Sequence, residues 1–209
     1  GTPACPISNK REIFYARAPT STATGNQTFR ELTKENWYRQ TRTVVIHESK
    51  HLVAFADRFV KSGNGFPTSN AFEHKWLEES SAMAAEELWA RSVYGYAQRG
   101  NVNYRNSIYC EVRPSGFPEC GPITKPRSMF DHFLLLHDYE TDIEHLSPLG
   151  QVGSDDFTWY GSGWALLRWA IDHAAISESA FLTSLTQEPT ARGVDNLAAR
   201  AGRTFADLI

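Results

Sequence analysis

The 209-residue sequence has few cysteines, little excess charge and no long apolar run, and each scarcity excludes a class of protein. No stretch approaches the roughly 20 apolar residues that a membrane-spanning helix requires, so we expect no transmembrane segment. The 21 Lys and Arg residues nearly balance 24 Asp and Glu residues, which gives a net charge of −3 and a pI near 6.2. Without a dense basic cluster, a nucleic-acid partner is not expected. The 6 Trp, 8 Tyr and 12 Phe residues are typical of a folded domain rather than a disordered chain.

The three cysteines allow either a disulfide or three reduced thiols. Cys110 and Cys120 flank a segment rich in Pro and Gly, and Cys5 lies near the start of the chain. A disulfide between Cys110 and Cys120 would contribute roughly 2–3 kcal/mol by restricting the unfolded chain, and would indicate an oxidising compartment. Alternatively, Cys5 pairs with one of the two. Because no CxxC pair occurs, a thiolate zinc site is not expected.

Hydrophobic periodicity predicts one strand and about six helices. Alternation predicts a strand over residues 11–18, and residues 100–126 are rich in turn formers. The helical pattern covers residues 33–61, 69–93, 128–137, 159–174, 178–186 and 194–201. We therefore expect a mainly helical α+β fold with a small N-terminal sheet remnant, to which further upstream strands would belong.

The first predicted helix contains His47-Glu48-Ser49-Lys50-His51, an H-E-x-x-H motif. Histidines at i and i+4 share a helix face, so both imidazoles can bind one zinc ion. Glu48 is offset by one residue, which places its carboxylate where it can take a proton from zinc-bound water. The alternative is an ordinary amphipathic helix with two exposed histidines. The apolar residues just before the motif favour the metal site, because they are expected to bury this helix.

A catalytic zinc ion needs a third protein ligand and an open position for water. Glu79, on the second predicted helix, shares a face with core residues. A carboxylate is costly there unless a cation neutralises it, so Glu79 is the expected ligand. Glu78 is rotated by about 100° and is expected to be a solvated acid. Glu73 and His74, at the start of the helix, are further alternatives.

H-E-x-x-H on one helix and W-L-E-E-S at residues 76–80 on the next resemble the gluzincin class of zinc metallopeptidases. The chain is most similar to the hyicolysin family of secreted bacterial proteases, and aminopeptidase-type gluzincins are more distant. The family pattern usually reads W-L-N-E-G, so Glu78 and Ser80 depart from it. The ligand position itself is kept.

The resemblance implies a zincin-like fold in two parts. Residues 1–98 would form the zinc-binding core, with the strand, the H-E-x-x-H helix and the glutamate helix. Residues 99–209 would form a mostly helical C-terminal lobe that completes the active-site cleft. The implied zinc ligands are His47, His51 and Glu79. The implied general base is Glu48.

Residues 159–167, W-Y-G-S-G-W-A-L-L, resemble the Y-x-x-G segment that opens a helix in aminopeptidase-type gluzincins. By this resemblance, the Tyr160 hydroxyl would stabilise the oxyanion of the tetrahedral intermediate. Gly161 and Gly163 would allow the helix start to approach a substrate closely. The alternative is that Tyr160 only packs under the helix N-terminus.

A histidine that binds a metal normally donates its second ring N–H to a carboxylate or carbonyl. Thermolysin-like enzymes use an Asp four residues after the ligand Glu, and Met83 occupies that position here. Glu86, the nearest acid on the same face, is the candidate partner, unless it is simply solvated. The acidic run at residues 137–145 is expected to be a solvated turn rather than a calcium or second zinc site.

The sequence therefore predicts a secreted or cell-surface, bacterial-type zinc metalloendopeptidase that acts as a monomer on protein or peptide substrates with Zn²⁺ as its cofactor. A peptide would bind along the predicted edge strand at residues 11–17. Two other functions stay open: a non-catalytic zincin-like domain that binds protein or glycan, and a fragment of an aminopeptidase-type gluzincin. The complete set of His47, His51, Glu79 and Glu48 argues against the non-catalytic domain.

Overall fold

The structure is a computed structural model that describes residues 34–61, 72–102, 129–147, 149–150, 157–188 and 190–208. These residues form six α-helices and one short 3-10 helix, without a strand, so the predicted mainly helical character is confirmed for them. The predicted strand at residues 11–18 and the three cysteines lie outside the described residues. The elements are α1 (Lys34–Lys61), α2 (Lys75–Tyr94), α4 (Phe130–Glu140), α5 (Trp159–His173), α6 (Glu178–Thr186), α7 (Gly193–Ala201) and η4 (Phe205–Asp207).

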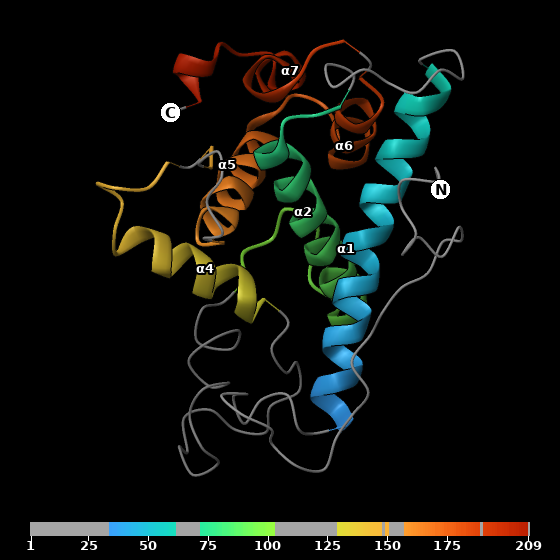
Figure 1. Ribbon diagram of the computed structural model, residues 1–209, viewed down its shortest axis with the longest axis vertical. Coiled ribbons are helices and arrows are strands. Elements are labelled where there is room, and N and C mark those ends of the chain that lie inside the picture. Colours follow the sequence, from blue (N-terminus) through green and yellow to red (C-terminus); the bar gives the residue numbers. More distant parts are fainter. Residues whose placement is uncertain are drawn as a thin grey trace, which may run out of the picture. The chain divides into compact units, whose positions relative to one another are not determined.

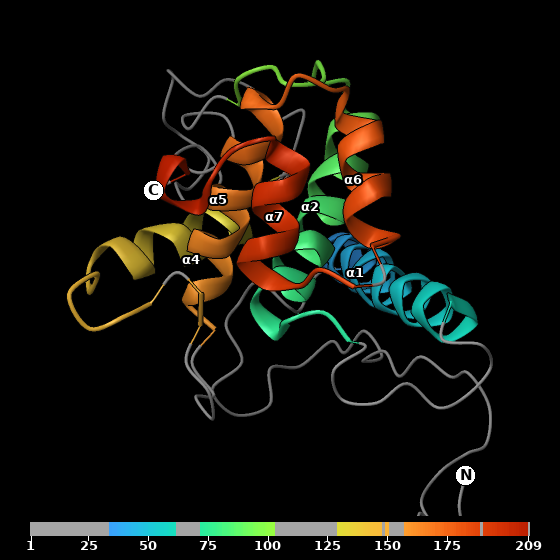
Figure 2. The same ribbon diagram turned by 90° about the horizontal axis from the view of Figure 1, so that it is seen from above.

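The chain divides into two compact units, residues 1–46 and residues 47–209. The boundary falls inside α1, so the H-E-x-x-H motif and the rest of that helix belong to the second unit. The division at residues 98 and 99 stays a prediction. Within the second unit α2 and α5 lie side by side, α4 packs on α5, and α6 and α7 follow at one end (Figures 1 and 2).

The core of the second unit forms where apolar helix faces meet. Leu77 of α2 and Leu167 of α5 are completely buried, as are Phe181 of α6 and Leu197 of α7. These side chains belong to one cluster, which removes the apolar stripe of each helix from water. None of the described helices is both long enough and apolar enough to cross a membrane.

The helix ends follow local chemistry in most places. The Ser177 side chain accepts a hydrogen bond from the backbone N–H of Ala180 at 3.2 Å and caps α6, whose predicted bounds are confirmed. Gly95 ends α2 in the left-handed conformation, with φ of +68°.

The prediction that α2 starts near residue 69 is wrong for residues 72–74, which are not helical. There the Glu73 carboxylate accepts hydrogen bonds from backbone N–H groups, including that of Gly193 at 2.6 Å.

Gly161 brings the first turn of α5 against the backbone of α4. A Cβ atom at this position would lie 2.1 Å from the Leu136 nitrogen and 2.4 Å from the Leu135 carbonyl carbon. The sequence-based interpretation of Gly161 as a point of approach to substrate is therefore wrong, because α4 occupies the space beside its Cα atom.

A buried polar network joins α2 to α5. The fully buried Glu87 carboxylate accepts hydrogen bonds from Arg91 Nε at 2.6 Å, Trp164 Nε1 at 2.8 Å and Arg168 Nη1 at 3.4 Å. His132 of α4 is also buried, and its Nε2 lies 2.8 Å from a carbonyl oxygen of α2. These bonds satisfy charges and polar groups that would be costly to bury alone, and they fix the register of the helices that carry the site.

The apolar side of α1 differs from the prediction. Val44 and Val45, which were expected to bury this helix just before the motif, are exposed, and so are Leu52 and Phe55 after it. Arg58 is instead buried, on the side that faces α2. The expectation that the apolar residues just before the motif bury the helix is therefore wrong for Val44 and Val45, and Ala54 and Arg58 are buried on α1 instead.

Candidate metal centre

His47 and His51 lie one turn apart on α1, with ring centroids 4.8 Å apart and an interplanar angle of 76°. Both rings direct Nε2 toward one carboxylate oxygen on α2. The Nε2 atoms of His47 and His51 lie 3.1 Å and 3.4 Å from Glu79 Oε2. The i, i+4 spacing and the packing of α1 on α2 therefore bring the three predicted ligands together.

Two of the three spacings between these atoms are close to those around a zinc ion, and all three atoms lie within 4.8 Å of one another. Zinc lies about 2.0–2.1 Å from nitrogen and oxygen ligands, and tetrahedral geometry then separates two ligand atoms by about 3.3–3.4 Å. The distances of 3.1 Å and 3.4 Å from Glu79 Oε2 to the two imidazoles are close to this value. Among the described residues, His47, His51 and Glu79 form the one group of three or more His, Cys, Asp or Glu side chains placed closely enough for a metal.

Each histidine also contacts a second carboxylate through Nδ1. His47 Nδ1 lies 2.7 Å from Glu86 Oε1, and His51 Nδ1 lies 2.9 Å from Glu78 Oε1. Glu86 thus lies where the sequence placed a partner for a ligand histidine. The expectation that Glu78 is a solvated acid is wrong, because α1 covers its carboxylate and leaves the side chain 22% exposed.

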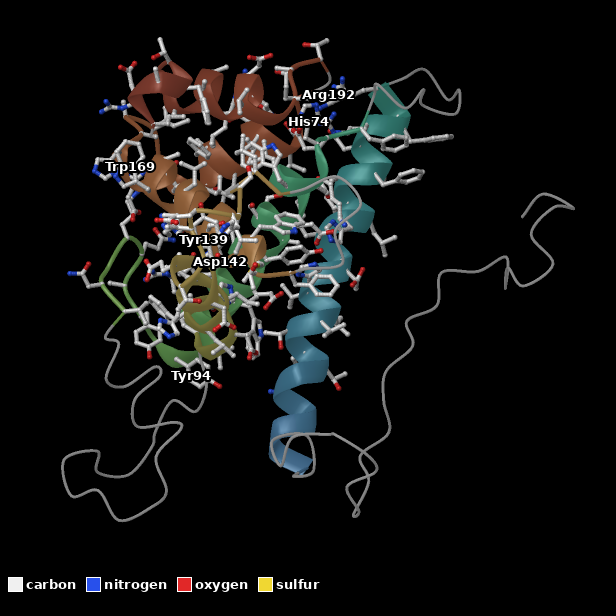
Figure 3. All side chains as sticks on the ribbon, turned by 60° about the vertical axis from the view of Figure 1, so that its left-hand side comes forward. His74, Tyr94, Tyr139, Asp142, Trp169 and Arg192 are labelled. Atoms are coloured by element: carbon white, nitrogen blue, oxygen red, sulfur yellow. The ribbon has the colours of Figure 1, made fainter. Side chains whose placement is uncertain are left out.

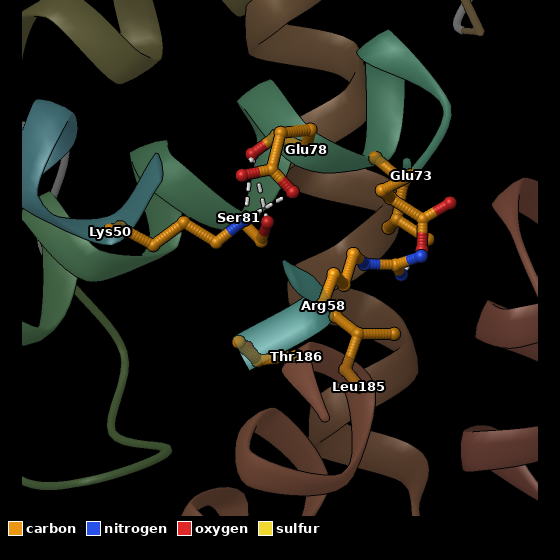
Figure 4. A pocket seen from close by; sticks show the side chains of 8 residues that line it. Lys50, Arg58, Glu73, Glu78, Ser81, Leu185 and Thr186 are labelled. Atoms are coloured by element: carbon orange, nitrogen blue, oxygen red, sulfur yellow. Dashed lines mark hydrogen bonds and ion pairs between the residues drawn. The ribbon is translucent and has the colours of Figure 1, made fainter. Parts of the chain in front are cut away.

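Lys50 completes the contacts of Glu78. Its Nζ lies 2.7 Å from Glu78 Oε2 and donates a hydrogen bond to the Glu78 backbone oxygen at 3.3 Å. Figure 4 shows Lys50 reaching Glu78 beside Ser81, in a small pocket that also contains the ion pair of Arg58 and Glu73. Burial lowers the pKa of Lys50, while the charge and hydrogen bonding of Glu78 oppose that shift.

The carboxylates set the charge state of the two histidines. Burial lowers the pKa of His47, but Glu79 and Glu86 outweigh it and raise the value to about 9. Hydrogen bonds to Glu78 and Glu79 raise the pKa of His51 to about 9 as well, against a smaller effect of burial. Burial would raise the pKa of Glu79, yet its hydrogen bonds to both histidines hold that pKa well below the usual range.

Tyr160 lies close enough to Glu79 and Glu48 for their charges to affect its pKa. Its side chain is half-buried at the start of α5. Burial, Glu79 and the nearby charge of Glu48 together raise the pKa of Tyr160 well above its ordinary value. The ring also packs against Trp159, with centroids 4.3 Å apart. Glu48 is exposed, so water can reach its carboxylate.

Glu73 and His74, the alternative ligands, have other contacts. The Glu73 carboxylate accepts hydrogen bonds from Arg58 at 3.2 Å and from Asn196 Nδ2 at 2.8 Å, and so ties α1 to α7. His74 lies beside Arg192, where the start of α2 meets the start of α7 (Figure 3). These residues hold helices together away from the three candidate ligands.

The acidic run at residues 137–145 was predicted to be a turn, but residues 137–140 form the end of α4 and only residues 141–145 form an exposed turn. Within it, His145 Nδ1 lies 2.5 Å from Asp142 Oδ1, and both side chains are more than half exposed. Figure 3 places Asp142 next to Tyr139, at the end of α4.

Sequence reasoning did not identify the pairing of Lys50 with Glu78. The one available signal is Glu78 itself, since it places an acid where the family pattern has Asn. A helical projection of α2 alone cannot show that Lys50 and His51 of α1 lie opposite.

Comparisons with known protein families, with curated proteins and with solved structures found no match to this chain. A role for the site therefore follows from its own geometry and chemistry.

Proposed function

We propose that this chain is a zinc-dependent peptidase, a hydrolase that cleaves peptide bonds of protein or peptide substrates. The observation that carries the proposal is the convergence of both imidazole Nε2 atoms, from His47 and His51, on one carboxylate oxygen of Glu79. The gluzincin resemblance and a zincin-like fold are part of this proposal. Endopeptidase action and a secreted location stay predictions from the sequence.

The donor set suits Zn²⁺, because two neutral imidazoles and one carboxylate are ligands that catalytic zinc sites use. When bound there, Zn²⁺ would supply a Lewis acid that polarises a carbonyl and brings the pKa of a coordinated water to about 7. Glu78 and Glu86 would hold the His51 and His47 rings by accepting their Nδ1–H groups.

The remaining residues would handle protons and developing charge. Glu48 is exposed and its charge contributes to the raised pKa of Tyr160, which supports its role as the base. Its carboxylate would accept a proton from the attacking water and pass it to the leaving amine. Tyr160 keeps its hydroxyl proton because its pKa is raised, and it would donate a hydrogen bond to the oxyanion.

Metal analysis and one isosteric substitution test this function. Purified protein should contain about one zinc ion per chain and should cleave a mixed peptide library, with cleavage lost on chelation and restored by zinc. Glu48→Gln should retain zinc but lose cleavage by a factor of about 10² or more, because it cannot accept a proton. The exposed Glu140 of α4 supplies the matched control, Glu140→Gln, which should cleave normally.

Two results would contradict the proposal. Less than a tenth of a zinc ion per chain would exclude the metal site, and full activity in Glu48→Gln would exclude Glu48 as the base. Bound zinc without cleavage of any library peptide would favour the non-catalytic binding domain instead.

A further inference from the structure

We propose that Lys50 and Glu78 form a charge-balanced pair that orients His51 for metal binding, and that both are positioning residues of the metal centre. This inference rests on the metal site of the proposed function, and not on the reaction that the site carries out.

A series of contacts connects Lys50 through Glu78 to the proposed metal ligands His51 and Glu79. Lys50 Nζ lies 2.7 Å from Glu78 Oε2, and the other oxygen, Oε1, lies 2.9 Å from His51 Nδ1. The opposite nitrogen of the same ring, Nε2, lies 3.4 Å from Glu79 Oε2. When His51 releases its Nε2 proton and keeps the Nδ1 proton that it donates to Glu78, the Nε2 lone pair faces Glu79 and can bind a metal.

A carboxylate is needed at residue 78 because two different groups use its two oxygens. The Lys50 side chain is only 13% exposed and lies one residue before His51. An unbalanced ammonium there would repel a divalent cation and would be costly to bury. The Asn of the family pattern has one carbonyl oxygen and no charge, so it could accept from His51 but could not neutralise Lys50.

The pocket beside Lys50 belongs to the contacts that position His51, and not to the side of α1 where substrate would bind. It is lined by the pair of Lys50 and Glu78 and by the pair of Arg58 and Glu73 (Figure 4). Residues 48 and 50 are separated by about 200° around a helix, so the pocket and the Glu48 carboxylate lie on different sides of α1. Substrate would meet Glu48 and Tyr160 on the other side.

Glu86 makes the equivalent contact to His47 from the next turns of α2, with 2.7 Å between His47 Nδ1 and Glu86 Oε1. The two rings are therefore held by different carboxylates. A change in the pair of Lys50 and Glu78 should affect the His51 side of the site and leave His47 in place.

The test measures zinc affinity by chelator competition, together with the visible absorption spectrum of the Co²⁺-loaded protein, in Glu78→Gln, Lys50→Met and the double variant. Glu78→Gln should weaken zinc binding roughly 10–100-fold and alter the cobalt spectrum, because it leaves the charge of Lys50 unbalanced and its single carbonyl oxygen must serve both Lys50 and His51. The double variant should bind zinc more tightly than Glu78→Gln alone, since the repelling charge is gone. Glu140→Gln, at an exposed position of α4, should change neither measurement.

The outcomes separate this inference from the proposed function. If the wild-type protein binds zinc and Glu78→Gln keeps its affinity and cobalt spectrum, the pair has no positioning role although the metal site stands. Equal affinities of the double variant and Glu78→Gln would likewise exclude charge balance by Lys50. A wild-type protein that binds neither metal would overturn both proposals. Circular dichroism of each variant verifies its fold, and the double variant carries the test if Glu78→Gln alone does not fold.

Discussion

Glu79 is the residue on which the candidate site converges. Its carboxylate lies within 3.4 Å of both imidazoles and also contributes to the raised pKa of Tyr160. One side chain of α2 thus connects a motif on α1 with the first turn of α5.

Substitution of Tyr160 by Phe tests the oxyanion role at the scale of one hydroxyl group. Phe keeps the ring that packs on Trp159, so the fold and zinc content should be unchanged. The rate of peptide cleavage should fall by about 10²–10³, since removal of one oxyanion donor costs roughly 3–4 kcal/mol in the transition state. Steady-state kinetics on one cleaved peptide measure this loss.

Tyr139→Phe is the matched control, because Tyr139 is a buried tyrosine at the end of α4 outside the site. An unchanged cleavage rate in Tyr160→Phe would reduce Tyr160 to a packing residue. A loss in both variants would indicate a general effect of removing a tyrosine hydroxyl.

At the scale of helices, sequence patterns predicted well what a single helix determines. The bounds of α6 follow from its Ser177 cap, and the spacing of His47 and His51 follows from helical geometry alone. The start of α2 depends on Glu73, whose carboxylate binds α7, so local propensity could not locate it.

The exposed apolar side of α1 and the covered position of Glu78 were missed for the same reason. A hydrophobic pattern shows that a helix has two faces, but not which face packs against its neighbour. Here contacts between α1 and α2 are ionic, as between Lys50 and Glu78. Hydrophobic periodicity cannot predict such contacts.

Gly161→Ala tests the close approach of α5 to α4. The added methyl group would meet the backbone of Leu135 and Leu136, which cannot move as a flexible side chain does. The free energy of unfolding should fall by about 3 kcal/mol or more, a large overpacking effect. Urea denaturation measures it, with Ser179→Ala, at an exposed position of α6, as the control. A loss below about 0.5 kcal/mol would show that the two helices are not held in contact at this point.

At the scale of the second unit, the parts of the site come from three helices and are held by buried polar contacts. Glu87 of α2 binds Trp164 and Arg168 of α5, which fixes Tyr160 relative to Glu79. The sequence predicted the candidate residues one by one, but it contained no signal for the contacts of Glu87 with α5, which join residues 77 or more positions apart in the chain.

The charges of this unit predict a pH dependence for protein stripped of metal by a chelator. The pKa values of His47 and His51 are raised from 6.5 to about 9. The folded protein therefore keeps protons that the unfolded chain has released. The resulting stabilisation is complete below pH 6.5 and is lost as the pH rises through about 9. The free energy of unfolding, measured with urea, should fall by on the order of 1–3 kcal/mol across this interval.

The stabilisation by zinc should change with pH in the opposite direction, because zinc competes with the same histidine protons. A histidine must lose its Nε2 proton before that nitrogen can bind a metal, so zinc competes with protons and should raise the melting temperature more at pH 8.5 than at pH 6.5. The variant with both His47→Gln and His51→Gln should show a flatter pH profile without metal and no shift with zinc. A wild-type protein whose stability rose with pH after chelation would mean that the two histidines are not charged partners of Glu78, Glu79 and Glu86. Stability without zinc should therefore fall as the pH rises, whereas the stabilisation by zinc should increase. Both effects depend on protonation of the Nε2 atoms of His47 and His51.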